Sequence, residues 1–188
     1  AAPADVARTE DCRRLVETAV DQWGGLDIVV NCAGIVRRAT VVGTTEDEWD
    51  RVMAVNVRSI FLLGKHAVPV MEQGGGGSIV NIGSVVGLAP EFGMSVYGAT
   101  KAFVLFLSQS LSLELSPKGV YVQAVLAAGT RTEIWERVGV DMSTLPELME
   151  VGELVVAARQ GLLSEIRQSL VAPRYHRQRA EALQVQSM

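Results

Sequence analysis

The segment SIVNIGSVVGLAPEFGMSVYGATK, residues 78–101, decides the fold. Its first five residues, Ser78–Ile82, form a short apolar run of strand type. A turn follows, and from Ser95 to Leu115 the apolar residues recur at helical spacing. A buried strand that leads into a long helix is the repeating unit of an α/β domain.

The same alternation extends in both directions from this segment. Earlier in the chain we expect a helix over Thr9–Trp23, ended by Gly24-Gly25, and a strand over Leu26–Val30. Residues Thr45–Glu48 have the pattern of a capping box. A long helical pattern begins there and continues to about Met71. Later segments predict a strand and two weaker helices, over Gly119–Leu126, Thr132–Val138 and Leu145–Leu163.

Short strands that are apolar on both faces and separated by helices predict a parallel sheet covered on both sides. Right-handed crossovers then make the fold class a doubly wound, Rossmann-like α/β domain. We place this domain in residues 1–163. Residues 164–188 carry arginines and little strand signal, and we interpret them as a C-terminal tail.

Composition and charge exclude several functions. A net charge of -4 and 5% aromatic residues argue against a nucleic-acid binder. No apolar run is long enough to cross a bilayer, and the start, AAPADVARTEDCRRL, lacks the apolar region of a signal peptide. Two cysteines suit a reducing compartment, so we predict a cytoplasmic protein. The scattered His and Cys residues show no metal-ligand spacing.

The pair Tyr97 and Lys101 carries the first chemical signal. Positions i and i+4 lie on one helix face, so the phenol and the ammonium project the same way. A nearby positive charge lowers the pKa of a phenol from its ordinary value of about 10, and a phenol so tuned exchanges a proton with an alcohol or carbonyl oxygen. The alternative is a surface Tyr and Lys on an ordinary amphipathic helix.

Ser84 supports the chemical interpretation. It lies just past a predicted strand, and parallel sheets place their sites at the carboxyl ends of strands. A hydroxyl there could bind and orient a reacting oxygen. The alternative is a serine that only caps a turn.

These motifs resemble the short-chain dehydrogenase/reductase family. The segment GSIVNIGSVVG followed by YGATK is similar to the family's central motifs, and Asn31-Cys32-Ala33-Gly34 is similar to its N-N-A-G motif. Asn56, in VMAVNV, matches the family's helix asparagine. The resemblance runs from about Asp5 to at least Thr132.

The resemblance implies an oxidoreductase that transfers a hydride between NAD or NADP and a secondary alcohol or ketone. Tyr97 would be the acid/base, and Lys101 would lower its pKa and bind the nicotinamide ribose. Ser84 would hold the substrate oxygen, and Asn56 would hold a water that links Lys101 to solvent. Cofactor contacts are implied for Asp5, Val6, Asn31, Ala33, Gly34, Tyr97, Lys101 and Thr132. Two neighbours have alternatives: Asn31 could tie adjacent strands together, and Cys32 is expected to be a small packing residue.

The sequence departs from the family pattern at three places. The glycine-rich cofactor loop is missing, and Gly74–Gly77 precedes a strand instead of opening a helix, so we interpret it as a hinge loop. Ala127-Ala128 stands where the family has Pro-Gly, and the family's last strand is not evident. The choice between NAD and NADP is therefore not readable.

Two other functions stay open. A non-catalytic relative, unable to bind cofactor, could serve as an oligomerisation subunit. The family implies homodimers or homotetramers formed through the helices 49–71 and 95–115. A serine hydrolase is the weaker alternative, because Gly93–Tyr97 only approaches the G-x-S-x-G motif. For the enzyme, apolar residues around Ser84 predict a small-molecule carbonyl or alcohol substrate.

Overall fold

A computed structural model describes residues 2–137, 139–144 and 148–160. In this part of the chain a sheet of three parallel strands has the order β1-β2-β3. The strands are β1 (Ile28–Asn31), β2 (Gly77–Ser84) and β3 (Val120–Ala127). The predicted α/β class with a parallel sheet is therefore confirmed. The predicted tail, residues 164–188, lies outside the described residues.

The helices follow the predicted order. They are α1 (Thr9–Trp23), α2 (Glu46–Met53), α3 (Ser59–Gln73), α4 (Ser95–Leu115) and α5 (Ile134–Arg137), and residues 151–160 are also helical. The bounds of α1 and α4 are the predicted ones. Gly24 ends α1 in the left-handed conformation, with φ 77°, and Thr45 forms the predicted capping box with Glu48.

The long helix expected up to Met71 is not continuous in its hydrogen bonding. A π-helical segment, Ala54–Arg58, separates α2 from α3 and contains Asn56. Such segments are rare and often lie at functional sites. Helical periodicity alone does not reveal this change, because the chain direction hardly alters.

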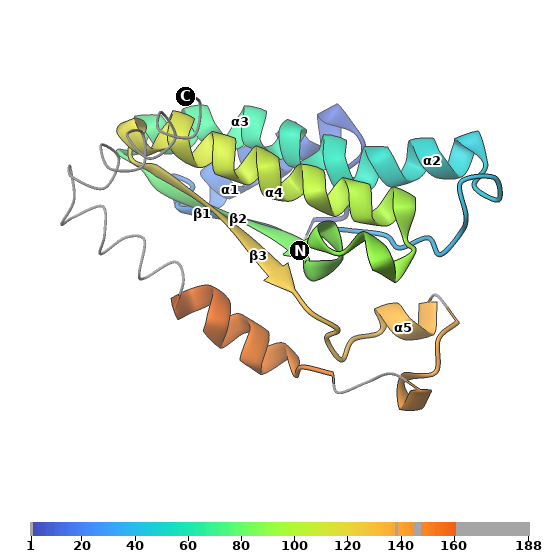
Figure 1. Ribbon diagram of the computed structural model, residues 1–188. Coiled ribbons are helices and arrows are strands. Elements are labelled where there is room, and N and C mark those ends of the chain that lie inside the picture. Colours follow the sequence, from blue (N-terminus) through green and yellow to red (C-terminus); the bar gives the residue numbers. More distant parts are fainter. Residues whose placement is uncertain (1, 138, 145–147, 161–188) are drawn as a thin grey trace, which may run out of the picture.

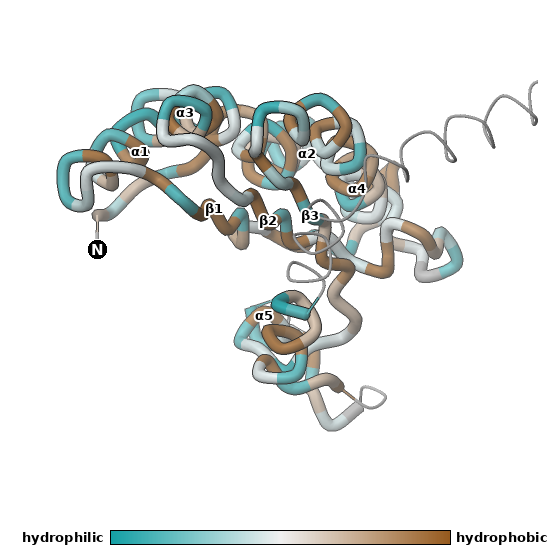
Figure 2. The backbone as a smooth tube through the Cα atoms, turned by 90° about the vertical axis from the view of Figure 1, so that its left-hand side faces the viewer, coloured by the Kyte–Doolittle hydropathy of each residue, from teal (hydrophilic) through white to brown (hydrophobic). Residues whose placement is uncertain are grey.

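The described helices cover the sheet unequally. Figures 1 and 2 show α1, α3 and α4 on one side of the sheet, whereas α5 lies on the other side, away from the strands. On the covered side, Met71, Ile79, Leu115, Val120 and Val122 form the buried core. The expected cover on both faces is therefore only partly present in the described chain. The strands that this core buries are β2 and β3.

The glycine run before β2 has a steric cause. Gly76 has φ 136°, and a Cβ on it would lie 2.5 Å from the carbonyl oxygen of Gly119. Only glycine permits this conformation and this close approach. The run therefore forms a tight turn packed against the start of β3, which is a more specific role than the predicted hinge.

Candidate active site

Three predicted side chains meet where β2 ends and α4 begins. The hydroxyl of Tyr97 makes a hydrogen bond with the side chain of Ser84. The ammonium of Lys101 lies over the Tyr97 ring, 5.6 Å from its centroid, and donates to the carbonyl oxygen of Ile82 at 2.9 Å. Ser84 is 8% exposed and Lys101 is 7% exposed. The strand end and the first two helical turns thus bring a phenol, a hydroxyl and an ammonium into one small region.

Burial dominates the electrostatics of this region. Burial raises the pKa of Tyr97, and the hydrogen bond from Ser84 offsets this only in part. Burial lowers the pKa of Lys101, against a smaller opposing effect of Cys32. The expectation that Lys101 makes Tyr97 unusually acidic is therefore wrong for the chain by itself. The ammonium lies over the ring and bonds the Ile82 carbonyl, while the phenol oxygen is bonded to Ser84.

Asn56 is buried behind this group and uses its whole amide within the protein. Its Oδ1 accepts from the backbone N–H of Ile35 at 2.8 Å, and its Nδ2 donates to the carbonyl of Ile35 at 2.9 Å. The Nδ2 also donates to the hydroxyl of Thr100 at 3.2 Å. Both amide hydrogens are thus in use, so the side chain holds the loop after β1 against α4. A water bound at Asn56 stays a prediction.

Two glycines set how closely the surrounding backbone approaches. A Cβ on Gly34 would lie 3.6 Å from Oδ1 of Asn56 and 3.7 Å from Nζ of Lys101, so this predicted cofactor residue borders the ammonium. A Cβ on Gly87 would lie 2.7 Å from the backbone of α4 at Lys101 and Ala102. Gly87 therefore lets the turn after Ser84 pack directly on α4.

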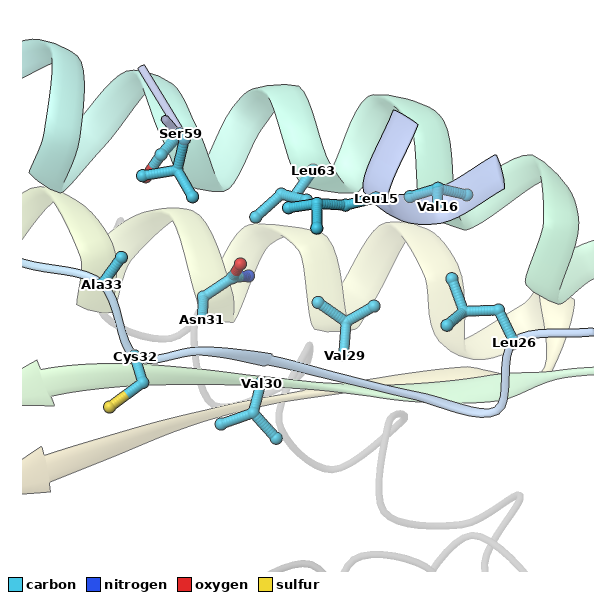
Figure 3. Close-up of a pocket in the computed structure, with 11 residues that line it drawn as sticks. Leu15, Val16, Leu26, Val29, Val30, Asn31, Cys32, Ala33, Ser59 and Leu63 are labelled. Atoms are coloured by element: carbon cyan, nitrogen blue, oxygen red, sulfur yellow. The ribbon is translucent and has the colours of Figure 1, made fainter. Parts of the chain in front are cut away.

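A cavity of about 240 Å³ lies beside β1 and brings together three more of the predicted cofactor residues, Val6, Asn31 and Ala33. In Figure 3, Asn31 points from β1 toward α3, whereas Val30 and Cys32 point to the opposite side of the sheet. The Asn31 Nδ2 donates to Oδ1 of Asn81 at 2.7 Å, which ties β1 to β2, and its own Oδ1 is buried without a partner. Cys32 is exposed, so the expectation of a packing residue is wrong.

The two remaining predicted cofactor residues, Asp5 and Thr132, do not line this cavity. The carboxylate of Asp5 accepts from the backbone N–H of Ala7 and from Arg51, and these bonds lower its pKa. Thr132 is exposed between β3 and α5, and within the described chain no hydrogen bond ties it to the other site residues.

Sequence reasoning missed three participants. The carbonyl of Ile82 holds Lys101, Gly87 allows the close approach of the turn, and Thr100 links Asn56 to the helix. Thr100 alone had a visible signal, since it stands inside the Tyr97–Lys101 motif. The other two act through the backbone, which leaves no pattern in side-chain type.

The residues present fit one end of a nicotinamide dinucleotide. The buried Oδ1 of Asn31 is an acceptor without a partner, and Gly34 lets the backbone pass close to the ammonium of Lys101. No glycine-rich turn opens a helix N-terminus in the described residues, so the phosphate-binding part is not found there. In the same residues no three metal-ligating side chains gather, and no helix is long and apolar enough to span a membrane.

Parallel α/β sheets place their sites at the carboxyl ends of strands, and Ser84, Tyr97 and Lys101 meet at such a strand end. The family model described as short chain dehydrogenase matches residues 1–142, so the chain belongs to this family. An uncharacterized oxidoreductase from Thermotoga maritima is 42% identical over 129 residues, which are 69% of this chain and 51% of that protein. The chain spans about half the length of the curated relatives it matches.

Solved structures give the same result. A short-chain dehydrogenase from Sphingobium yanoikuyae in complex with NADPH has a TM-score of 0.74 and 46% identity, and the match covers 92% of this chain and 77% of that chain. A 3-ketoacyl-(acyl-carrier-protein) reductase from Brucella melitensis complexed with NADH has a TM-score of 0.75 and 28% identity, covering 83% of this chain and 67% of that chain. The Rossmann-type fold is thereby confirmed.

Proposed function

We propose that this chain carries the acid/base part of an oxidoreductase that interconverts a ketone and a secondary alcohol with NAD or NADP. The observation that carries the proposal is the phenol of Tyr97, bonded to Ser84 and covered by the ammonium of Lys101. A bound nicotinamide would supply or accept the hydride, and the protein would supply or accept the proton.

In the direction of ketone reduction, Tyr97 donates its proton to the oxygen that the hydride transfer leaves negative. The phenol carries its proton at neutral pH, because its ordinary pKa is about 10 and burial raises it. The hydroxyl of Ser84 holds and orients the same oxygen. The ammonium of Lys101 is fixed beside the ring by the Ile82 carbonyl, so it lies next to the phenolate left behind.

Both cofactors stay in the proposal. Of the two solved relatives described above, one contains NADPH and the other NADH. The nicotinamide end would lie along Gly34 toward Lys101, and the adenosine end toward the cavity beside β1. The turn after Ser84 presents Leu88, which is 62% exposed and offers an apolar contact to a substrate. Both cysteines are free, which supports the predicted cytoplasmic location.

Titration with NADH and with NADPH, followed through the melting temperature, tests this function. A ligand that binds only the folded state raises the stability, by about 2.7 kcal/mol at a hundredfold excess over the dissociation constant. We expect one of the two cofactors to raise the melting temperature of the wild-type chain. The Lys101→Met variant, which keeps the bulk and removes the ammonium, should show a much smaller rise. No rise with either cofactor would favour the non-catalytic alternative.

We also propose that the chain pairs with copies of itself through the helices 49–71 and 95–115. These helices expose large apolar side chains in the single chain: Trp49, Phe61, Phe103, Phe106 and Leu113. An apolar surface of this kind is typical of an interface between subunits. Light scattering should give a dimer or tetramer for the wild type and a smaller species for Phe106→Glu. A wild-type monomer would contradict this proposal.

A further inference from the structure

Thr100 occupies an unusual position between the two reactive side chains of α4. It is 1% exposed and lies one residue before Lys101. Its hydroxyl donates to the backbone carbonyl of Tyr97 at 2.7 Å, which is a helical i to i−3 bond. The same hydroxyl oxygen accepts from Nδ2 of Asn56 at 3.2 Å. A single hydroxyl thus links the Tyr97 backbone to a residue of another helix.

The link continues beyond Asn56. The amide of Asn56 makes two bonds with the backbone of Ile35, the residue that follows Gly34. A continuous series of hydrogen bonds therefore runs from the loop after β1, through Asn56 and Thr100, to the turn that carries Tyr97 and Lys101. Because Gly34 borders Lys101, this series determines the spacing between the predicted cofactor wall and the acid/base pair.

We propose that Thr100 is a positioning residue for the acid/base pair. Its hydroxyl holds the first two turns of α4 against Asn56, so that Lys101 stays buried on the Ile82 carbonyl and Tyr97 stays at Ser84. This proposal rests on the proposed function, since the pair has a use only in that reaction. Thr100 itself contacts neither substrate nor cofactor.

The helix contains a matched control two turns further on. Ser108 is also 1% exposed, its hydroxyl donates to the carbonyl of Val104 at 2.6 Å, and it accepts from Nδ2 of Asn81 at 2.9 Å. Loss of the Ser108 hydroxyl therefore removes the same kinds of bond from the same helix. The reactive pair, however, lies at the other end of that helix, so Ser108→Ala separates a general loss of stability from a loss of positioning.

Lysine labelling tests the proposal without relying on activity. The chain has three lysines, and Lys65 and Lys118 are exposed references for the buried Lys101. Acetic anhydride labelling, read by peptide mass spectrometry, gives the rate at Lys101 relative to the other two. We expect Thr100→Val to raise this relative rate about fivefold, as loss of one buried hydrogen bond allows. Thr100→Ser and Ser108→Ala should retain the wild-type ratio.

The outcomes separate the positioning role from the proposed function. An unchanged ratio in Thr100→Val, or an equal rise in Ser108→Ala, would overturn the positioning role. If Thr100→Val does not fold, Thr100→Ala removes the same hydroxyl with less bulk and is judged in the same way. In a ketone-reduction assay, Thr100→Val should lower kcat with little change in KM, and Thr100→Ser should restore it. The expected labelling with an inactive wild type would contradict the proposed function alone.

Discussion

The end of β2 and the edge at β1 lie side by side in the sheet, but their side chains are buried to different degrees. At the end of β2, Ser84 and Lys101 are buried and bonded to neighbours in the described chain. At the β1 edge, Ile28 and Val30 are 58% and 57% exposed, and among the described residues β1 pairs only with β2. The cavity lined by Val6 and Asn31 lies beside this open edge.

This difference separates two requirements of the proposed reaction. Proton transfer uses the β2 end and the first two turns of α4, both of which are packed. Cofactor binding needs, in addition, the wall that runs along β1, where the described packing is incomplete. The acid/base group is therefore packed even though the β1 edge is open, and the hydrogen bonds of Asn56 connect this group to the cofactor wall. Each of the following variants tests one side of this contrast.

The largest effect is expected at the β2 end. Tyr97→Phe removes the proton donor and keeps the ring, so ketone reduction should fall about a thousandfold, within the range of general acid catalysis. The melting temperature should change little, because one partly buried hydrogen bond to Ser84 is lost. Turnover with NADH and NADPH, beside a melting curve, measures both effects.

Tyr121→Phe is the matched control for this variant. It makes the same chemical change near the start of β3, far along the strand from its carboxyl end. Turnover of Tyr121→Phe should stay close to the wild type. If Tyr97→Phe retained full turnover, the proton would have to come from another group, and the proposed mechanism would be wrong.

An effect of intermediate size is expected on the free energy of unfolding when core residues of β2 and edge residues of β1 are truncated. Ile79 on β2 is 1% exposed and belongs to the core, so Ile79→Ala should lower the free energy of unfolding by about 3 kcal/mol. Ile28 on β1 is exposed, so Ile28→Ala should change it by less than about 0.5 kcal/mol. Urea unfolding of the two variants gives both values. Equal losses would show that the β1 edge is buried in solution, for instance by another chain.

The fold was predictable because its signals are local. The apolar spacing in α1 and α4 fixed their bounds, and the capping box fixed the start of α2 near Thr45. The π segment around Asn56 was not predictable, since a change in hydrogen bonding leaves the apolar pattern intact. The unequal cover of the sheet was missed for a similar reason. Strands that are apolar on both faces predict that both faces of the sheet are covered. They do not indicate which segments of the chain cover each face.

The candidate site was predictable in its members and less so in its electrostatics. The spacing of Tyr97 and Lys101 correctly put them on one helix face, and the strand end placed Ser84 beside them. The pKa of Tyr97 moved in the opposite direction to the prediction, because burial of the phenol depends on tertiary packing. The exposure of Cys32 has the same origin, since a neighbouring strand or loop decides whether a residue is packed.

The smallest expected effect concerns the titration of Tyr97. The Ser84 hydroxyl donates to the phenolate and lowers its pKa, while burial raises it more. Ser84→Ala should therefore move the titration of Tyr97 to a higher pH than in the wild type. Tyrosinate absorbance measures this shift, and subtraction of the Tyr97→Phe curve in each background isolates the one residue. A lower titration midpoint in Ser84→Ala would mean that water enters the site and that burial is not the dominant cause.

The sign of this shift also fixes a pH dependence of stability. A folded-state pKa above the ordinary value of about 10 means that the folded chain holds this proton more tightly than the unfolded chain. The stability that Tyr97 contributes is thus complete below about pH 10 and is lost as the pH rises through the folded-state pKa. Ser84→Ala should extend this contribution to higher pH, and Tyr97→Phe should remove it. Ile28→Ala should leave it unchanged, because the open β1 edge takes no part in burying the phenol.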